Sequence, residues 1–548
     1  MTARHKIITR KLILGIIIVA AIASPGITSA EIIFQPQENI DSRINELMSQ
    51  GDIPSLAAGI VINDTLVWSK GYGDQPDLDT VYMIASITKI FTATAIMQLY
   101  DNGTLDLDTD INNYIPFGVR NPNYPSDPIT IRMLLTHTSG INHGVSDEIL
   151  WDWDVDMINW QNIKMGWNFT PWDPRPTLGE FLNGSLNPSG AYYAPENWQS
   201  RPGTRWGYSN TGFLLLSYLV EQLTNQSYAG YLQKNVFDPL DMTSTGFNYT
   251  DFTGRNAIPY ELRNNTNDAY PIYNQHNLGA GALRSTVPDL ANFLIAHMNQ
   301  GSYNSTPILL PQTVDLMQTR HLYTWGTELC GFQRYGQGLG WPLFRGNIIG
   351  HSGAIHGFLA QIAFKTVNNG KYGIVFMVNR GVTLVEDDYL ANTFFPSMID
   401  LLLDEAARLF SLYKQLAILS SPFAAVPFTI NEQPQSTPYQ ESLIQDSYVI
   451  EMPETHGEYN WAHWLEDGDT NRTKVVIVNT SITLTGVFCH FCDLDKNGCV
   501  NMKDIAVAAS AFGSDPNHPR WNPNADINRD NKVDLMDIGN TARNFGKT

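Results

Sequence analysis

Ser86 and Lys89 are the residues whose types and spacing most directly suggest chemistry. They stand in the segment Ser86-Ile-Thr-Lys89, which reads as the start of a helix. Residues three apart on a helix share one face. A serine hydroxyl becomes a nucleophile when a neighbouring group takes its proton, and a lysine made less basic by burial can do this. The pair therefore predicts covalent catalysis, although the short pattern also recurs by chance.

Two further motifs follow in the chain. Tyr208-Ser-Asn210 lies directly before a predicted helix, and His351-Ser-Gly353, followed by Ala354, lies just before a pair of strand-like runs. The order S-x-x-K, Y-x-N and K/H-x-G resembles that of serine β-lactamases and penicillin-binding proteins. The connecting sequence, over about Glu38 to Tyr413, resembles the class C β-lactamase-related group, which includes DD-peptidases, D-aminopeptidases and esterases. The segments that carry this resemblance are Ile53-Pro54, Ile84 to Lys89, Gly103 to Asp108, Leu134 to Gly140, Pro202 to Gly212, Pro239 to Met242 and Gly350 to Gly353.

The resemblance implies a role for each motif residue. Ser86 would be the acylated nucleophile, and Lys89 with Tyr208 would form the proton-transfer network, with Tyr208 also helping as a phenolate or through Lys89 to activate the deacylating water. Asn210 would orient the substrate amide. The backbone N–H groups of Ser86 and Ala354 would form the oxyanion hole.

His351 departs from the β-lactamase pattern, which usually has lysine there. A lysine supplies a permanent cation for a substrate carboxylate, whereas a histidine with a pKa near about 6.5 is mostly neutral at neutral pH. This substitution favours an esterase or aminopeptidase over efficient β-lactam hydrolysis. Some DD-peptidases of the group also carry histidine, so β-lactam-like substrates stay open.

Two segments near the C-terminus repeat one another at a distance of 33 residues, from Asp493 to Asp526. Oxygen-bearing side chains at loop positions 1, 3, 5, 9 and 12, with a backbone carbonyl from position 7, are typical of a Ca²⁺ loop. The first copy supplies Asp493, Asp495, Asn497, Cys499, Asn501 and Asp504, and the second supplies Asp526, Asn528, Asp530, Lys532, Asp534 and Asp537. We therefore expect two calcium ions. Asn531 replaces Gly498 at position 6, which is tolerable because asparagine visits the left-handed region more readily than most residues.

Each loop is followed by one helical run, Ile505 to Phe512 and Ile538 to Phe545. Loop-helix duplicates of this length resemble the dockerin module, which binds a cohesin. This resemblance implies a cohesin-like partner. Met502-Lys503 and Leu535-Met536 replace the Ser-Thr recognition pair of many dockerins, so the partner type stays open.

The cysteines allow two interpretations. Cys489, Cys492 and Cys499, together with His490, could form a zinc site, but a second properly spaced pair is missing. A local disulfide that braces the entry to the repeat is favoured. Cys330 would then be free or pair with the remaining cysteine.

The predicted elements define an α/β fold. Two hairpins flank turn sequences, Leu56–Ile62 with Leu66–Tyr72 and Phe358–Phe364 with Tyr372–Val378, and helices at Ser86–Tyr100, at Gly212–Leu223 and from Thr286 onward lie between them. This order predicts an antiparallel sheet flanked by helices with an all-helical insert, closed by a helix near Ser397–Leu412. We expect a hydrolase domain over 31–415, a linker with a small strand element over 416–488 and the small α-helical Ca²⁺-binding dockerin-like module over 489–548.

Composition limits the partners and the compartment. The chain has 548 residues, 54 acidic and 34 basic, and a net charge of −20, so nucleic acid is excluded as a partner. Arg4 to Lys11 is basic, Leu12 to Ala23 is apolar, and small residues end at Ala30, which predicts a cleaved secretory signal or, alternatively, a retained N-terminal anchor. We expect a secreted or cell-surface protein. Glycosylation sequons stand at Asn63, Asn102, Asn168, Asn183, Asn225, Asn248, Asn264, Asn304, Asn471 and Asn479.

Aromatic and histidine residues near the motifs allow a structural or a substrate-binding interpretation. The tryptophans between the motifs could wall the substrate cleft or form the core of the insert; they are Trp151, Trp153, Trp160, Trp167, Trp172 and Trp198. His137 and His356 are interpreted as structural. The expected function is an exported serine hydrolase acting on a small molecule or a peptide. The alternative is a catalytically idle binding or adhesion protein that keeps the fold.

Overall fold

The structure is a computed structural model that describes residues 38–143, 151–166, 168–263, 266–323, 326–327, 333–367, 370–381 and 389–547. The predicted signal segment, Trp167 and Cys330 lie outside the described residues. Within the described part of the chain, no helix is both long and apolar enough to cross a membrane.

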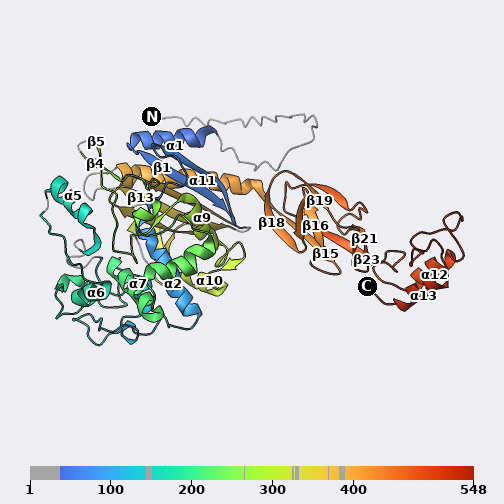
Figure 1. Cartoon of the computed structure of the whole chain (residues 1–548), viewed down its shortest axis with the longest axis horizontal. Helices are drawn as coiled ribbons and strands as arrows, with labels where there is room; N and C mark the ends of the chain where they lie inside the picture. The colour runs from blue at the N-terminus through green and yellow to red at the C-terminus, as the bar shows by residue number, and fades with distance from the viewer. Residues whose placement is uncertain are drawn as a thin grey trace, which may run out of the picture. The chain divides into compact units, whose positions relative to one another are not determined.

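An antiparallel sheet organises the first part of the chain (Figure 1). Its strands, in spatial order among the described residues, are β2 (Thr65–Gly73), β1 (Ser55–Ile62), β14 (Gly370–Val378), β13 (Phe358–Val367), β12 (Ile348–Ile355), β11 (Pro342–Phe344), β10 (Gln333–Gln337) and β9 (Gly326–Thr327). Both predicted hairpins are confirmed. Strand β1 of the N-terminal hairpin pairs with β14 of the hairpin near the other end of the domain, so the two hairpins belong to one continuous sheet.

Helices cover both faces of this sheet. Because successive strand residues point to opposite faces, Phe376 and Gly373 of β14 mark different sides. The ring of Phe376 packs on Phe395 of α11 (Phe395–Leu412), whereas Gly373 lies against Leu294 of α9 (Val287–Met298). Helix α1 (Glu38–Gln50) contacts α11. The side chain of Thr286 caps α9, at the predicted helix start.

The insert between the hairpins is rich in helix and carries the remaining small elements. Helices α2 (Thr88–Asp101) and α7 (Asn210–Thr224) confirm the two helices expected after the first and second motifs. The other helices are α3 (Ile131–Leu135), α5 (Val155–Met165), α6 (Leu178–Leu186), α8 (Tyr228–Leu232) and α10 (Pro311–Gln318), with short helical turns η1 (Ala85–Ile87), η2 (Ile111–Asn113), η3 (Pro195–Asn197), η4 (Gln233–Phe237), η5 (Asp238–Leu240) and η6 (Tyr249–Phe252). A further turn, η7 (Leu390–Phe394), follows the second hairpin and leads into α11. The short strands are β3 (Tyr82–Met83), β4 (Tyr260–Arg263), β5 (Thr266–Ala269), β6 (Arg284–Ser285), β7 (Ser302–Tyr303) and β8 (Thr306–Pro307), so the insert is not all-helical.

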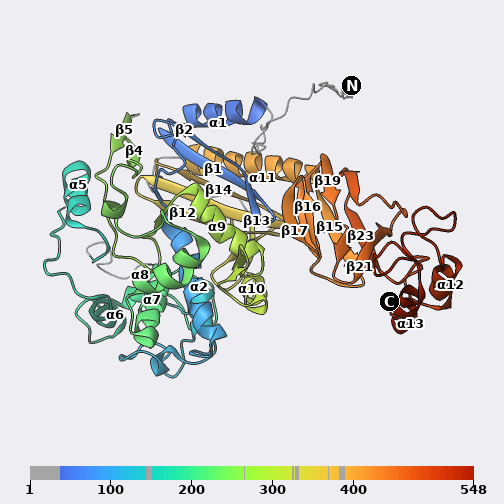
Figure 2. The same ribbon diagram turned by 45° about the vertical axis from the view of Figure 1, so that its right-hand side comes forward.

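The segment predicted as a linker is instead a folded β domain (Figure 2). Within residues 413–490, which the structure describes throughout, one sheet has the order β18-β15-β23-β21-β20 and the other β17-β16-β19-β22. The strands are β15 (Tyr413–Ser421), β16 (Pro427–Ile430), β17 (Gln433–Ser436), β18 (Tyr439–Ile444), β19 (Ser447–Glu451), β20 (Thr455–His456), β21 (Tyr459–Trp464), β22 (Thr473–Ile477) and β23 (Ile482–His490). Leu416, Phe428, Ile450 and Trp464 belong to its own hydrophobic core. The linker prediction was wrong because polar residues on the outer face of each strand dominate the composition. The core requires apolar side chains only on the inner face, at every second residue of a strand.

The C-terminal repeat contains α12 (Met502–Ser510) and α13 (Leu535–Arg543), one helix after each loop, as predicted. Its core is small and includes Ala511, Ala525 and Val533. Phe512 and Phe545, which we expected to continue the apolar faces of the two helices, lie beyond the helix ends and are exposed. The loops are joined by exchanged backbone hydrogen bonds: Val533 pairs with Gly513 and Ser514, and Val500 with Gly546 and Lys547.

Candidate active site

Ser86 lies in a tight turn between a strand and a helix. Strand β3 pairs with β6, and the chain then enters η1, which contains Ser86, before α2 begins at Thr88. Ala85 adopts a left-handed φ of 46°, which is rare for a residue with a Cβ. Unusual backbone of this kind is commonly held in place at functional sites. Ser86 is accessible at the surface of a pocket, although its neighbours Ala85 and Ile87 are buried.

Lys89 lies on α2 one turn beyond Ser86 and is fully buried. Its Nζ donates to Ser86 Oγ at 3.1 Å and to the carbonyl oxygen of Ala280 at 2.7 Å. The same nitrogen lies 4.9 Å from the centroid of the Tyr208 ring. The structure thus brings together the serine, lysine and tyrosine of the first two motifs.

Tyr208 is positioned by the segment that leads into α7. Ser209 is the N-cap of this helix, and its backbone N–H donates to His137 Nδ1 at 3.1 Å. The His137 ring also stacks on the Tyr208 ring, with centroids 4.6 Å apart, consistent with the structural role predicted for this histidine. Burial raises the pKa of Tyr208 to about 12, against the opposing effect of its hydrogen bond with Ser86. Tyr208 is therefore a neutral phenol at neutral pH.

Strand β12 brings the third motif against the serine turn. A Cβ on Gly353 would lie 2.1 Å from the carbonyl oxygen of Ile84, so only glycine permits this approach. The next residue, Ala354, is exposed and lines the same pocket as Ser86. Ser86 and Ala354, whose backbone N–H groups are predicted to form the oxyanion hole, thus line the same cavity.

His351 is buried and uncharged. Burial, followed by the charge of Lys89, lowers its pKa to about 3, which agrees with the prediction that it is neutral. Its Nδ1 lies 2.7 Å from the carbonyl oxygen of Ser352. Because a carbonyl only accepts, this geometry assigns the proton to Nδ1 and leaves Nε2 as an acceptor.

Arg334 is a residue near the site that the sequence analysis missed. Its guanidinium lies 4.4 Å from the Trp206 ring centroid, and burial lowers its pKa to about 10. It remains a cation at neutral pH, close enough to affect the pKa of both Tyr208 and His351. No local motif marks this arginine, because strand β10 brings it to the site from a distant part of the chain.

The pocket at Ser86 has a volume of about 290 Å³. Asn210 and Ala354 line it, whereas Lys89, Tyr208, His351 and Gly353 are not among its lining residues. Trp153 is also part of the lining, but Trp151 stacks on Phe181 with centroids 4.7 Å apart inside the insert. The tryptophans therefore serve both as cleft wall and as core.

His356 differs from the structural role that we expected, because it lines the pocket. Its Nδ1 lies 3.1 Å from the Tyr270 hydroxyl, and the Tyr273 hydroxyl donates to its carbonyl oxygen at 2.7 Å. Trp153 packs edge-on against its ring. His356 is thus held firmly at the pocket wall.

Comparison with known proteins decides the family. The family described as Beta-lactamase matches residues 40–392. The chain belongs to the beta-lactamase family. It has the β-lactamase fold of a family whose members are serine hydrolases.

Individual relatives agree with this assignment. Protein flp of Staphylococcus aureus (strain COL) is 29% identical over 357 residues, which is 63% of this chain and 63% of the relative. Beta-lactamase-like protein 2 of Dictyostelium discoideum is 30% identical over 283 residues, 48% of this chain and 46% of that one. The chain thus spans less than two thirds of the length of these relatives.

Two solved structures share the fold. An octameric penicillin-binding protein homologue from Pyrococcus abyssi has a TM-score of 0.53 and 22% identity, over 80% of this chain and 94% of that one. D-amino acid amidase from Ochrobactrum anthropi SV3 has a TM-score of 0.51 and 20% identity, over 68% and 99%.

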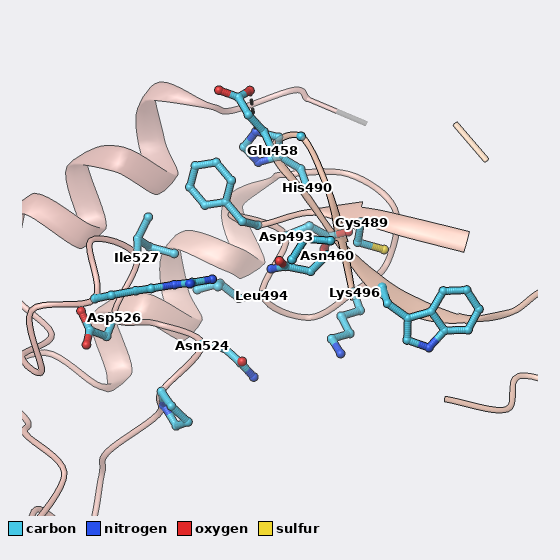
Figure 3. Close-up of a pocket in the computed structure, with 16 residues that line it drawn as sticks. Glu458, Asn460, Cys489, His490, Asp493, Leu494, Lys496, Asn524, Asp526 and Ile527 are labelled. Carbon is cyan, nitrogen blue, oxygen red and sulfur yellow. Dashed lines mark ion pairs between the residues drawn. The ribbon is translucent and has the colours of Figure 1, made fainter. Parts of the chain in front are cut away.

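Outside the beta-lactamase match, the C-terminal loops gather the predicted oxygen atoms. Carboxylate oxygens of Asp493, Asp495 and Asp504 lie within 4.8 Å of one another. Asp504 is fully buried, and its carboxylate accepts from the backbone N–H groups of Asp495 and Asn501 at 3.0 and 2.8 Å. Figure 3 shows Asp493 of the first loop and Asp526 of the second lining one pocket.

The second loop repeats the arrangement of the first. Asp526 accepts from the backbone N–H groups of Asp530 and Asn531 at 3.1 and 2.8 Å, as Asp493 does from Asn497 and Gly498. Asn531 has a φ of 66°, so asparagine adopts the left-handed turn expected of it. Buried Asp537 accepts from the N–H of Asp534 at 2.8 Å. The backbone hydrogen bonds of the two loops thus match, whereas among the described residues only the first loop brings three carboxylates within 4.8 Å of one another.

The cysteines near the first loop correct the favoured interpretation. Cys489, Cys492 and Cys499 are free, so the predicted local disulfide is absent from this described segment. Burial raises the pKa of both Cys489 and Cys492, to about 12 and about 11. Among the described residues, the one group with metal-ligating spacing consists of aspartates, which gives no support to the zinc alternative.

Proposed function

We propose that this protein is a serine hydrolase that works through an acyl-enzyme on Ser86. The observation that carries the proposal is the short contact between Lys89 Nζ and Ser86 Oγ, 3.1 Å, at the edge of a substrate-sized pocket. Tyr208 adds a second hydrogen-bonding group at the same hydroxyl. A nucleophile within hydrogen-bond reach of a base is the arrangement that covalent catalysis requires.

In the proposed acylation, Lys89 acts as the base in its deprotonated form and takes the proton of Ser86 as Oγ bonds to the substrate carbonyl carbon. The N–H groups of Ser86 and Ala354 stabilise the oxyanion, each by roughly 3 kcal/mol. The bond to the leaving group then breaks, and the leaving group receives a proton from the Lys89–Tyr208 pair. In the second half-reaction, water gives a proton to the Lys89–Tyr208 pair and bonds to the acyl carbon. The bond between that carbon and Oγ then breaks, the carboxylic acid leaves, and the proton returns to Oγ of Ser86. Because Tyr208 is a neutral phenol, it relays protons and does not act as a permanent base.

The substrate class in this proposal is an ester, a D-amino-acid amide or peptide, or a β-lactam-like compound. Neutral His351 disfavours substrates that need a cation at that position. Buried Arg334 supplies positive charge from behind Tyr208 but does not line the pocket.

Labelling with a fluorophosphonate, followed by mass spectrometry of the intact protein and its peptides, tests the catalytic assignment. We expect one adduct, on Ser86, that the Ser86→Ala variant loses. Ser189→Ala is the control, because Ser189 is exposed and does not line the pocket. An adduct on another residue, or none on folded protein, would overturn the assignment.

We further propose that the C-terminal repeat binds two calcium ions and docks the enzyme to a cohesin-like partner outside the cell. The three carboxylates gathered in the first loop support one ion, and the matching backbone hydrogen bonds and repeated sequence of the second loop support the other. Met502, Leu535 and Met536, at the starts of α12 and α13, are 65%, 73% and 64% exposed, which suits an apolar protein surface. Retention of the full-length protein on an immobilised cohesin should require Ca²⁺ and be lost in chelator. Retention that is equal in both buffers would contradict the proposal.

Export completes the proposed function. The basic and apolar residues that precede Ala30 support a secretory signal. N-terminal sequencing of protein recovered from the culture medium or the cell surface should begin at Glu31. Protein found in the cytoplasm with its N-terminus intact would contradict export.

A further inference from the structure

One wall of the Ser86 pocket is built from hydrogen-bond acceptors. Asp152, Gln275 and Asn277 all line the pocket, and their exposed fractions are 6%, 6% and 4%. The three residues come from two chain segments joined by a bridge between Trp153 and Gln275. None of them belongs to the motifs that suggested the catalytic site.

The Asp152 side chain is fixed in this wall. Its Oδ1 accepts from the backbone N–H of Asn277 at 2.7 Å, and its Oδ2 accepts from Gln275 Nε2 at 2.8 Å. The N–H of His276 also donates to the Asp152 carbonyl oxygen at 2.8 Å. The carboxylate is therefore held in place before any substrate arrives.

Two neighbouring acceptors have no protein partner. Gln275 Oε1 and Asn277 Oδ1 are buried and make no hydrogen bond among the described residues. The hydrogen bond from Gln275 Nε2 to Asp152 fixes the orientation of this amide and so directs Oε1 away from the carboxylate. Leaving a buried acceptor unsatisfied costs about 1–3 kcal/mol, so such atoms point to a missing donor.

Burial raises the pKa of Asp152 to about 7, so the wall carries a negative charge above that pH, and a bound cation would stabilise the ionised form further. Among the described residues that line the pocket, none is lysine or arginine. His143 is kept neutral, since burial lowers its pKa. Arg175 and Lys89 act on Asp152 from outside the lining, but the Arg175 guanidinium donates to the Trp153 carbonyl oxygen and Lys89 to Ser86 and Ala280.

We propose that Asp152, with the side-chain oxygens of Gln275 and Asn277, binds a primary ammonium on the acyl part of the substrate. An ammonium group carries one positive charge and several N–H donors, which matches one carboxylate and two unsatisfied amide oxygens. This inference rests on the proposed acyl-enzyme and narrows its substrates to amides, peptides or esters of amino acids whose α-amino group is free. A substrate carboxylate at the same place would face the anion of Asp152. Asp152 is thus a specificity-determining residue.

The test compares two substrates that differ in the ammonium group. Alanine p-nitroanilide, used as separate D and L enantiomers, carries it, and isobutyryl p-nitroanilide replaces it with a methyl group of similar size. We expect kcat/KM for the preferred alanine enantiomer to exceed that for the isobutyryl compound at least about 10-fold, the effect of a hydrogen bond to a charged group. Equal values would overturn the proposal.

Variants assign the preference to this wall. Asp152→Asn should lower kcat/KM for the alanine substrate about 10- to 100-fold and leave the isobutyryl rate nearly unchanged. Asp156→Asn is the matched control, because Asp156 is exposed on the following helix and lies outside the pocket. If Asp152→Asn does not fold, Asn277→Leu provides the test, since it removes Oδ1 and keeps the backbone N–H that Asp152 needs. A preference that survives in a folded variant of either kind would overturn the proposal.

Binding separates this inference from the proposed catalysis. Calorimetric titration of the Ser86→Ala protein should show binding of alaninamide in at least one enantiomer and weaker binding of isobutyramide. This result would support the ammonium site even if fluorophosphonate failed to label Ser86. Labelling of Ser86 without any preference for alaninamide would support the hydrolase and overturn the ammonium site.

Discussion

The serine site and the C-terminal loops are both clusters of polar groups, but they are stabilised in different ways. Lys89 is fully buried and His351 nearly so, inside a large hydrophobic core, and the buried histidines there are uncharged. The loops bring carboxylates together over a small hydrophobic core, which includes Ala511, Ala525 and Val533. The comparison teaches that the first site is held by packing and hydrogen bonds, whereas the second, if it binds calcium as proposed, would use the cation to offset the repulsion between its carboxylates.

Replacing Lys89 tests the serine site most severely. Lys89→Met keeps the length of the side chain and removes the base, so we expect acylation to slow about 10²- to 10⁴-fold. The free energy of unfolding should not fall, because an apolar side chain suits this buried position. Stopped-flow acylation and urea denaturation measure the two effects. A rate within tenfold of wild type would show that another group takes the proton.

Removal of calcium tests the stability of the C-terminal loops. For the full-length protein, scanning calorimetry in Ca²⁺ and in chelator should show one transition lost or shifted strongly downward, with the hydrolase transition unchanged. At an ion concentration of about 1,000 times Kd, the stabilisation is about 4 kcal/mol.

Variants of the two loops provide the control for the chelation experiment. Asp504→Asn and Asp537→Asn each remove a buried carboxylate from one loop. Each should reduce the calorimetric stoichiometry from about two ions to about one. A melting profile that is identical with and without chelator would contradict the calcium assignment.

A matched pair of glycine substitutions sharpens the contrast in packing. A Cβ at Gly353 would lie 2.1 Å from the carbonyl oxygen of Ile84, whereas a Cβ at Gly539 in α13 would meet nothing within 4 Å. Gly353→Ala should lower the free energy of unfolding of the hydrolase domain by about 1–3 kcal/mol and slow acylation. Gly539→Ala should stabilise its helix by up to about 1 kcal/mol. Similar effects at the two positions would contradict the packing argument.

The last prediction is a pH dependence of stability in the packed region. Burial lowers the pKa of His297 to about 3, and its Nε2 lies 3.0 Å from Thr94 Oγ1. The unfolded chain takes up a proton below about pH 6.5 but the folded chain does not, so stability falls as pH drops from about 6.5 toward 3, by about 1.4 kcal/mol per pH unit for one proton.

His297→Gln should remove about 2 kcal/mol of the stability change between pH 7.5 and 5.0. Denaturation of the wild type and the variant at both pH values measures this difference. A lower stability of the variant than of the wild type at pH 7.5 measures the effect of the substitution on packing. The change in that difference between pH 7.5 and 5.0 measures the effect of histidine titration. An unchanged pH dependence would contradict the assignment.

The sequence allowed the motif-bearing parts of the molecule to be predicted well. Ser86, Lys89 and Tyr208 stand in short segments with distinctive spacing, and the structure brings them together. Likewise, Asn531 adopts the left-handed turn that its place in the repeat requires. The geometry within each motif is local and depends on neighbouring residues in the chain, whereas the association of Tyr208 with Ser86 was implied by the resemblance in motif order.

Other features depend on contacts between distant segments, and these were missed. Asp152 and Gln275 are far apart in sequence, and only the folded insert joins them. Arg334 reaches the site through strand β10, without a motif of its own. The β domain was missed for a related reason: its core uses scattered residues, such as Leu416 and Trp464, that a local composition does not single out.

If the two loops bind calcium as proposed, the exchanged hydrogen bonds of the C-terminal repeat make the two ions interdependent. Val533, in the second loop, pairs with the residues that follow α12, and Val500, in the first loop, pairs with those that follow α13. Ordering one loop therefore also restrains the chain that the other loop needs, so the second ion meets a smaller entropy loss than the first. We expect calcium to bind with positive cooperativity and a Hill coefficient above 1, so that the module responds to the ion over a narrow concentration range.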